Sequence, residues 1–259
     1  MPAAALLLAF LTLSVLPATL GAQGATDPRT AKPERPTVAT HAWTVAPGYA
    51  EVETGLEWDD NRDGTHLLST PTLLKIGLTA RTQLGVATQL DRASGSGIGV
   101  GDVSLVLKYR VADHLPVLGA LAIIPTLKLP TGASMYGTGT TDVSALLVSS
   151  HSLGDLSVDV NLGFTHRFGD ASRAPRNATM WTVSAGLPLV GPLGATAEVF
   201  GFPATRGPAG SPGTVALLAG PTLVIRPWWV VDIGGILHLS GPQPDALYAG
   251  LVYNIGRVF

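Results

Sequence analysis

The chain has 259 residues and a formal net charge of −2, so nothing in it points to a nucleic-acid partner. Only 13% of its residues are charged, against about 25% in a typical soluble domain, and 31 glycines and 20 prolines disfavour long helices. The sequence contains no cysteine, which excludes disulfides and thiolate metal sites and fits an exported bacterial protein.

The first part of the chain is typical of a targeting segment. An apolar run from Ala3 to Leu20 gives way to polar composition near Ala22, which predicts a secretory signal peptide over residues 1–22. An N-terminal membrane anchor is the alternative, since no Lys or Arg precedes the run. No later segment has the roughly 18 consecutive apolar residues that a membrane-spanning helix needs.

Residues 23–47 are rich in Pro, Thr and Ala and show no periodicity. Their composition predicts a mobile N-terminal segment. The same segment could instead fold into the mouth of a barrel as a plug, and the sequence leaves this open.

From residue 48 onward, apolar and polar residues alternate. The clearest stretch runs from Leu156 to Thr165, where every second residue is apolar and the residues between them are small or polar. A period of two indicates a strand with one apolar and one wet face, and about ten residues suffice for a tilted strand to cross a bilayer. The pattern recurs and predicts about twelve strands, with ten as the fallback: residues 49–58, 67–78, 82–91, 101–111, 118–128, 140–150, 156–166, 178–187, 194–201, 213–226, 229–239 and 246–259.

The connections between these segments alternate between long and short. This arrangement predicts an all-β, antiparallel, up-and-down transmembrane β-barrel over residues 48–259, in the bacterial outer membrane and with both barrel termini periplasmic. Pro71, Pro125 and Pro221 fall inside predicted strands, where proline cannot donate a ladder hydrogen bond. They indicate either bulges or misplaced boundaries. A soluble periplasmic barrel is an alternative, and it requires the two faces to be exchanged.

Aromatic residues cluster near the predicted strand ends, as expected for girdles at the two membrane interfaces. The predicted periplasmic set is Tyr49, Tyr109, Trp228, Trp229, Tyr253 and Phe259, and the predicted outer set is Trp58, Phe164, Phe168, Trp181, Phe200, Phe202 and Tyr248. The terminal Phe259 resembles the C-terminal signal by which bacterial barrels are recognised by the barrel-assembly machinery.

The polar face carries thirteen charged residues that we expect to line the lumen: Glu51, Glu53, Glu57, Lys75, Asp102, Lys108, Arg110, Lys128, Asp142, Asp159, Glu198, Arg226 and Asp232. In one interpretation they line a polar conduit and set its selectivity. In the other they form a salt-bridged network that fills a narrow barrel. About twelve strands lie between filled and open barrels, so both interpretations stand.

Three stretches carry a family resemblance: Gly99 to Arg110 (GVGDVSLVLKYR), Leu127 to Gly132 (LKLPTG) and Gly137 to Val143 (GTGTTDV). Their order and spacing resemble the outer-membrane barrels of the "MetA-pathway of phenol degradation" family, over roughly residues 49–259. The resemblance implies an outer-membrane barrel and uptake of small, often aromatic, molecules. It implies no catalytic residues.

Other motifs favour ordinary structural roles. Asp59-x-Asn61-x-Asp63-Gly64 copies half of a calcium loop, but Thr70 stands where the bidentate acid belongs, so a hairpin loop is the simpler interpretation. The six histidines lack metal-ligand spacing, and the glycines at 95, 97, 99 and 101 do not form a dinucleotide fingerprint. No cofactor is therefore predicted.

Four hypotheses of function follow. The first is a passive outer-membrane channel for small molecules, with membrane lipid and a small solute as its partners. The second is a structural or adhesive barrel with a filled lumen. The third, a barrel enzyme acting on lipid, needs a nucleophile set at the rim that no motif singles out, so we do not predict an enzyme. The fourth is the soluble periplasmic barrel.

Overall fold

The computed structural model describes residues 27–170 and 174–259. These residues form thirteen β-strands: β1 (Tyr49–Asp60), β2 (His66–Gly77), β3 (Thr82–Ala93), β4 (Ile98–Val100), β5 (Val103–Leu115), β6 (Gly119–Leu129), β7 (Thr141–Leu153), β8 (Leu156–Phe168), β9 (Asn177–Val190), β10 (Leu193–Phe202), β11 (Thr214–Arg226), β12 (Trp229–Ser240) and β13 (Asp245–Arg257). Within this part of the chain, no helix is long and apolar enough to cross a membrane.

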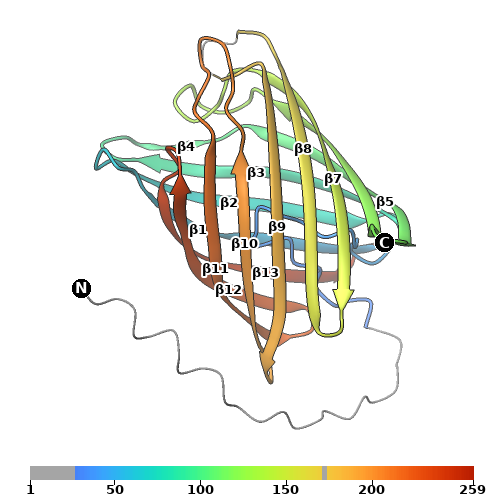
Figure 1. The fold of residues 1–259 in the computed structure, drawn as a ribbon. Coiled ribbons are helices and arrows are strands. Elements are labelled where there is room, and N and C mark those ends of the chain that lie inside the picture. The colour runs from blue at the N-terminus through green and yellow to red at the C-terminus, as the bar shows by residue number, and fades with distance from the viewer. Residues whose placement is uncertain (1–26, 171–173) are drawn as a thin grey trace, which may run out of the picture.

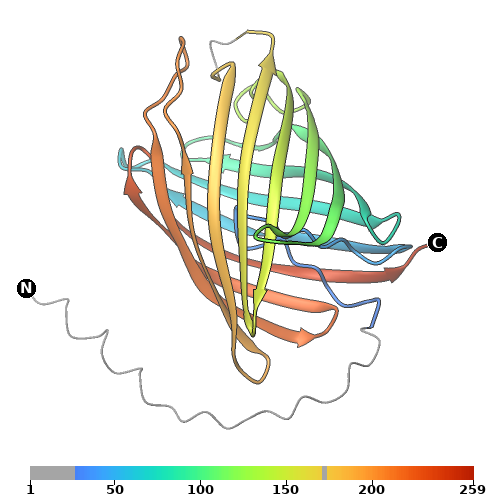
Figure 2. The ribbon, with the colours of Figure 1, turned by 45° about the vertical axis from the view of Figure 1, so that its right-hand side comes forward.

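The strands close into a single barrel (Figures 1 and 2). Each long strand is antiparallel to the next along the chain, and β1 pairs with β13 to close the ring. The three-residue β4 pairs only with β3 and belongs to the connection from β3 to β5. The twelve remaining strands form the wall, which confirms the predicted all-β, up-and-down barrel of about twelve strands.

The apolar side chains of the strands point away from the enclosed space. In β8, Leu162 is 58% exposed and Phe164 50%, whereas Asn161, next to Leu162 in the chain, is fully buried in the barrel. The same alternation places large exposed hydrophobic residues around the wall, from Leu74 on β2 to Ile233 on β12. The polar face is therefore internal, as predicted, and the exchanged faces of a soluble barrel are not found on the described strands.

The two ends of the barrel differ. One end carries two- to four-residue turns, such as the turn at residues 227–228 between β11 and β12. The other end carries longer loops, including residues 130–140 between β6 and β7 and residues 203–213 between β10 and β11. We call these the short-turn end and the long-loop end.

The three prolines expected inside strands, Pro71, Pro125 and Pro221, mark interruptions of the ladder rather than bulges. Pro71 pairs in register with Gln89 of β3, but on its other side the pairs of β1 and β2 skip from Thr54–Thr72 to Glu57–Ser69. The ladders beside Pro125 and Pro221 skip two pairs in the same way. Because proline has no N–H, it leaves one side of its strand unpaired while the strand itself continues.

One part of the interior is apolar, which the alternation did not predict. Phe200 is 2% exposed and Tyr248 3% exposed, and both pack inside the barrel with Leu218 and Ile236. The prediction that Phe200 and Tyr248 belong to the outer aromatic girdle is therefore wrong, and it is wrong for Phe202 too, which lies on the same face of β10 as Phe200. A period of two separates the two faces of a strand, but it does not show that Val38, from outside the strands, covers this inner face and keeps it dry.

Candidate functional site

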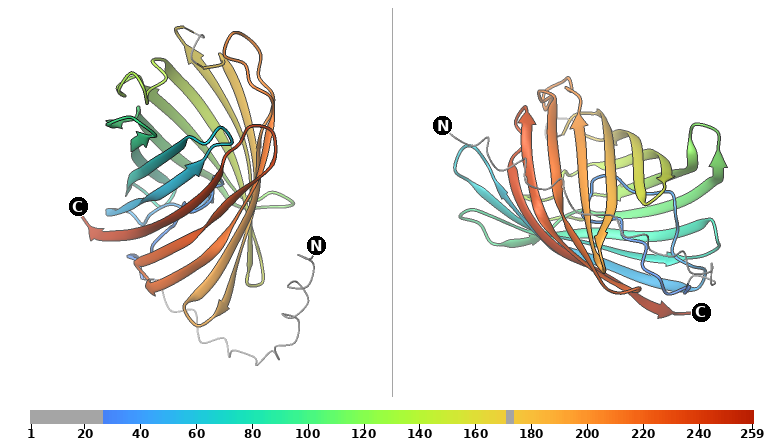
Figure 3. Two further views of the ribbon diagram at one scale, coloured as in Figure 1. Left: turned by 90° about the vertical axis from the view of Figure 1, so that its left-hand side faces the viewer. Right: turned by 60° about the horizontal axis from the view of Figure 1, so that its bottom comes forward.

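Residues 27–47 lie inside the barrel (Figure 3). The segment starts at the short-turn end, where the N–H of Ala31 donates to the carbonyl of Pro227 at 2.8 Å. It then crosses the lumen and returns to the same end, where the N–H of Gly48 donates to Gly77. The described part of the segment is thus folded into the barrel, which is the second of the two alternatives that the sequence left open. We call it the luminal segment.

The barrel wall holds the luminal segment by its backbone. Because the segment forms no ladder with a strand over most of its length, its N–H groups need other acceptors. Eight of them donate to side chains of the wall at 2.7–2.9 Å: Lys32 to Glu51, Glu34 and Arg35 to Glu53, Val38 and Ala39 to Glu198, Thr40 to Asn161, Ala42 to Ser150 and Val45 to Gln83. The acceptors belong to strands on all sides of the barrel, so the segment is bound across its full width.

A buried ion network connects the luminal segment to β1, β2 and β5. The ammonium of Lys75, which is fully buried, lies 2.8 Å from Glu51 and 3.4 Å from Glu34 and contacts Glu53. Lys108, also buried, lies 2.9 Å from the Glu34 carboxylate. Such a network is stable only when each buried charge has a partner, and here the segment supplies one of them.

The two lysines set the charge state of Glu34. Burial alone would raise the pKa of this carboxyl, but the nearby Lys108 and Lys75 ammonium groups hold its pKa well below the ordinary value of a glutamate. Glu34 is therefore an anion over the physiological pH range, and it binds the segment to the wall.

The luminal segment divides the lumen into two cavities. The long-loop cavity has a volume of about 610 Å³ and reaches the loops at the long-loop end. The short-turn cavity has a volume of about 540 Å³ and lies at the opposite end, beside Pro227. Arg35, Pro36 and Thr37 line both cavities, so these residues form the partition between them.

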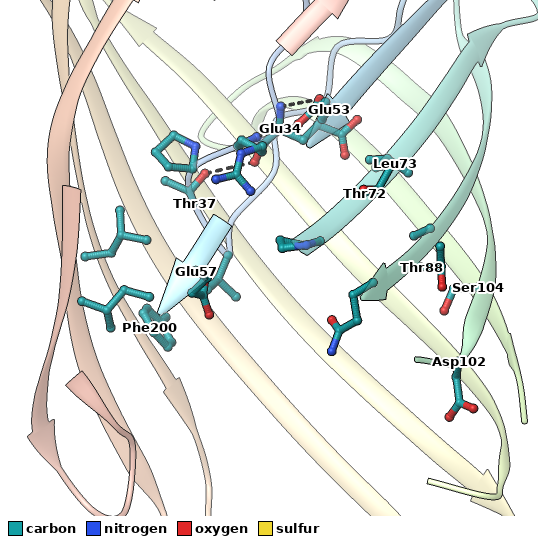
Figure 4. A pocket seen from close by; sticks show the side chains of 18 of the residues that line it. Glu34, Thr37, Glu53, Glu57, Thr72, Leu73, Thr88, Asp102, Ser104 and Phe200 are labelled. Atoms are coloured by element: carbon teal, nitrogen blue, oxygen red, sulfur yellow. Dashed lines mark hydrogen bonds between the residues drawn. The ribbon is translucent and has the colours of Figure 1, made fainter. Parts of the chain in front are cut away.

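The walls of the long-loop cavity differ in polarity. In a ring of twelve strands, β10, β11 and β12 stand opposite β3, β5 and β6. The first group contributes Phe200, Phe202, Leu218 and Ile236, and the second contributes Gln89, Ser104 and Lys128. Figure 4 shows Phe200 on one side of the cavity and Ser104 on the other, with the luminal segment at one end. The cavity is thus apolar on one side and polar on the other.

The three stretches that carry the family resemblance meet at the long-loop end. Asp102 accepts hydrogen bonds from the N–H of Gly132 at 2.9 Å and of Thr138 at 3.0 Å, and it pairs with Lys128 at 2.7 Å. A side chain on Gly132 or Gly137 would meet the Asp102 carboxylate within 3 Å, so the motif needs glycine at both positions. The cluster fixes the loop of residues 130–140 against β5.

The structure places the thirteen expected lumen residues in several environments. Glu53, Glu57, Asp102 and Lys128 line the long-loop cavity, and Asp159 and Asp232 line the short-turn cavity. Glu51, Lys75, Lys108 and Glu198 bind the luminal segment, and Asp142 lies beside Lys128 and Arg167. Arg110 lies at the short-turn end, where its guanidinium covers the Trp43 ring at 4.9 Å and pairs with Asp113.

Arg226 is separate from the others. It is exposed at the turn between β11 and β12, and its Nη1 donates to the carbonyl of Ile225. It contributes to neither ion network.

Sequence reasoning missed two groups of residues that the site uses. Glu34 and Arg35 belong to the luminal segment, whose course the sequence does not show. Gln83, Ser150 and Asn161 are uncharged acceptors on the inner face. Their inward position follows from the alternation, and a search for charged residues alone passed over them.

The described residues contain no group of three or more His, Cys, Asp or Glu side chains that could hold a metal ion. The half calcium motif forms a loop in which Asp63 accepts a hydrogen bond from the N–H of Thr65 at 2.9 Å.

Comparisons with known proteins show the same fold. No protein-family model and no curated protein sequence matches the chain. Among solved structures, an outer-membrane channel from Pseudomonas putida F1 is similar at 14% identity with a TM-score of 0.63, over 83% of this chain and 98% of that one. The KdgM porin in complex with disordered oligogalacturonate is similar at 11% identity with a TM-score of 0.55, over 78% and 98%. The NanC porin has 11% identity, a TM-score of 0.53 and coverage of 79% and 98%.

Proposed function

We propose that the protein is an outer-membrane channel for small solutes, and that its own luminal segment gates it. The observation that carries the proposal is the partition at Arg35, Pro36 and Thr37, with one cavity on each side of it. The apolar outer surface fits a lipid environment, and the likeness in fold to outer-membrane channels supports the same location. In this proposal, solute crosses by passive diffusion when the segment moves.

The proposal also orients the barrel. In outer-membrane barrels the short turns are periplasmic and the long loops extracellular, so both ends of the barrel chain, at Gly48 and Phe259, would be periplasmic. After export and cleavage of the proposed signal peptide, the chain would be in the periplasm, so the luminal segment would enter the barrel from the periplasmic, short-turn end. The exposed terminal Phe259 would serve recognition by the barrel-assembly machinery.

Small aromatic solutes are the proposed cargo. The apolar side of the long-loop cavity supports this class, as does the resemblance of the three motif stretches to the phenol-degradation family. In such a cavity the wall supplies binding and orientation, and no chemistry on the solute is required.

A filled structural barrel is the second candidate. It is favoured by the buried network of Lys75 and Lys108 with Glu34, which ties the segment to the wall. If that network never opens, the lumen stays blocked and the barrel only anchors its loops at the membrane surface.

A reversible crosslink separates the two candidates. The chain has no cysteine, so the pair Ala42→Cys and Ser150→Cys would be its only thiols, at positions where the N–H of Ala42 donates to the Ser150 hydroxyl at 2.8 Å. We expect single-channel conductance in planar bilayers to be low when the pair is oxidised and to rise when it is reduced. Each single-cysteine variant is the control. Conductance that stays absent after reduction, but appears once residues 27–47 are deleted, would favour the filled barrel.

A further inference from the structure

Among the described residues, one acid in the long-loop cavity has neither a hydrogen-bond donor nor an ion-pair partner. Six charged residues line this cavity, and five of them form ion pairs: Glu34 with Lys108, Glu53 with Lys75, Arg35 with Asp232, and Asp102 with Lys128. The sixth is Glu57 on β1, which accepts no hydrogen bond and forms no ion pair within the described residues. Figure 4 shows its carboxylate among the residues that surround the cavity.

Among the aromatic residues that line the same cavity, Phe202 has the most exposed ring. Phe202, at the end of β10, is 39% exposed, whereas Phe200, Leu218 and Ile236 behind it are almost completely buried. The rings of Phe202 and Phe200 meet edge to face, with their centroids 6.0 Å apart. Phe200 thereby supports the orientation of Phe202, and the exposed ring offers a surface for a flat apolar group.

We propose that the long-loop cavity binds single-ring solutes that carry a hydrogen-bond donor, above all a cationic amine. The ring contacts Phe202 and the donor binds the Glu57 carboxylate. This proposal rests on the proposed channel function, whose solute class it makes narrower. The cavity volume of about 610 Å³ is within the range of about 300–1,000 Å³ that is usual for small-molecule sites.

The unpartnered acid decides which ring substituents are favoured. An ammonium group forms a charge-assisted hydrogen bond to Glu57, and a hydroxyl group forms a neutral one, which is weaker. A ring carboxylate brings a second negative charge next to Glu57, and Glu57 itself offers it no donor. The expected order of affinity is therefore amine, then alcohol, then carboxylate.

Isothermal titration of the full chain in detergent at low ionic strength tests this order with benzylamine, benzyl alcohol and benzoate. We expect benzylamine to bind at least tenfold more tightly than benzoate, with benzyl alcohol between them. Glu57→Gln should remove the difference between amine and carboxylate, and Glu57→Asp should retain it. Phe202→Leu should weaken the binding of all three probes.

Asp159→Asn is the matched control, because it removes one luminal charge from the short-turn cavity and leaves the long-loop cavity unchanged. It should preserve the order of affinity, and heat-modifiable mobility on gels shows that each variant is a folded barrel. The proposal is overturned if benzoate binds as tightly as benzylamine, if no probe binds, or if Asp159→Asn abolishes the preference as fully as Glu57→Gln. Conductance is measured separately. If the barrel conducts but fails these titrations, only the proposed solute preference is refuted. If it binds the probes but never conducts, the proposed channel function is refuted.

Discussion

Gly55 on β1 lies directly opposite Gly250 on β13, and the guanidinium of Arg35 fills the slot that these two residues leave in the inner wall. A β-carbon would lie 2.7 Å from Arg35 Nη2 at position 55 and would overlap Arg35 Nε at position 250. The slot allows Arg35 to reach Asp232 at 3.3 Å. Since Arg35 also belongs to the partition between the cavities, this glycine pair positions the centre of the luminal segment.

Gly250→Ala should therefore loosen the gate. The added methyl group occupies the place of the Arg35 guanidinium and breaks the contact with Asp232, so the partition loses an attachment on one side. We expect a higher open probability in single-channel recordings, by a factor of several. Gly97→Ala is the control, because a β-carbon there meets no atom within 4 Å. Equal conductance of the two variants would contradict the role of the slot.

The two ends of the luminal segment are each held by an arginine–aromatic contact. Arg29 lies over the Trp228 ring at 4.7 Å, and Arg110 lies over the Trp43 ring at 4.9 Å. Contacts of this type contribute about 0.5–2 kcal/mol each. Arg29→Ala and Trp43→Leu should each increase hydrogen exchange in residues 30–45 by up to about 30-fold, as mass spectrometry would show. Unchanged exchange in the double variant would show that the ends do not hold the segment.

Lys75→Met should destabilise the barrel strongly. It leaves Glu51 and Glu53 buried without their cation, and removal of one partner from a buried ion network costs about 3–5 kcal/mol. Urea-induced unfolding in detergent measures the loss. Arg81→Met is the matched control, because its pair with Asp113 is about half exposed and we expect no measurable change. A Lys75→Met barrel as stable as the original would show that the network adds nothing to the fold.

Asp102→Asn tests the motif cluster at the long-loop end. The amide keeps the shape of the carboxylate but loses its charge, so the ammonium of Lys128 loses its 2.7 Å partner. We expect the loop of residues 130–140 to detach and become the first site of proteolysis, with the barrel itself intact. Asp63→Asn, in another loop of the same end, is the control and should leave the cleavage pattern of residues 130–140 unaltered.

The contribution of Glu34 to the docking of the luminal segment should be lost only in strong acid. The folded-state pKa of Glu34 is lowered by Lys108 and Lys75, so its contribution to docking is fully present above the pKa of a free glutamate, about 4.3. This contribution is lost as the pH falls through the lower folded-state pKa. We expect the difference in hydrogen exchange of residues 30–45 between the unaltered chain and a Glu34→Gln variant, which lacks the contribution throughout, to be constant from pH 7 to about 4.5 and to shrink below that range. A difference that already shrinks at pH 6 would contradict the assignment.

The wall could be predicted from the sequence because each strand repeats one local rule. In β8, the sequence alone shows that the apolar Leu162 and the polar Asn161 lie on opposite faces, and the structure shows that the face of Asn161 is the inner one. The alternation also placed Glu51, Lys75 and Lys108 on the inner face. For these residues, the alternation and the cost of exposing a charge to lipid both place the side chain on the inner face.

The interior could not be predicted in the same way. The N–H groups of Val38 and Ala39 donate to Glu198 on β10, about 160 residues further along the chain, so no local sequence pattern predicts these hydrogen bonds. The segment needs no period of its own because eight of its hydrogen bonds to the wall come from backbone N–H groups, which do not depend on the side chain. Val38 of that segment packs against the inner cluster that contains Phe200 and Tyr248, so the burial of these two rings could not be predicted without the course of the segment.

Three of the four prolines in the wall strands have a mechanical consequence. Each removes two pairs from one ladder, at Pro71, Pro125 and Pro221, while the other ladders restrain the strands along their length. A cylinder with three such seams bends most easily along them, and its cross-section changes from round to oval at lower cost than that of a uniformly bonded tube. The interruption at Pro71 borders the long-loop cavity. We therefore expect the wall to deform most easily beside the proposed solute site.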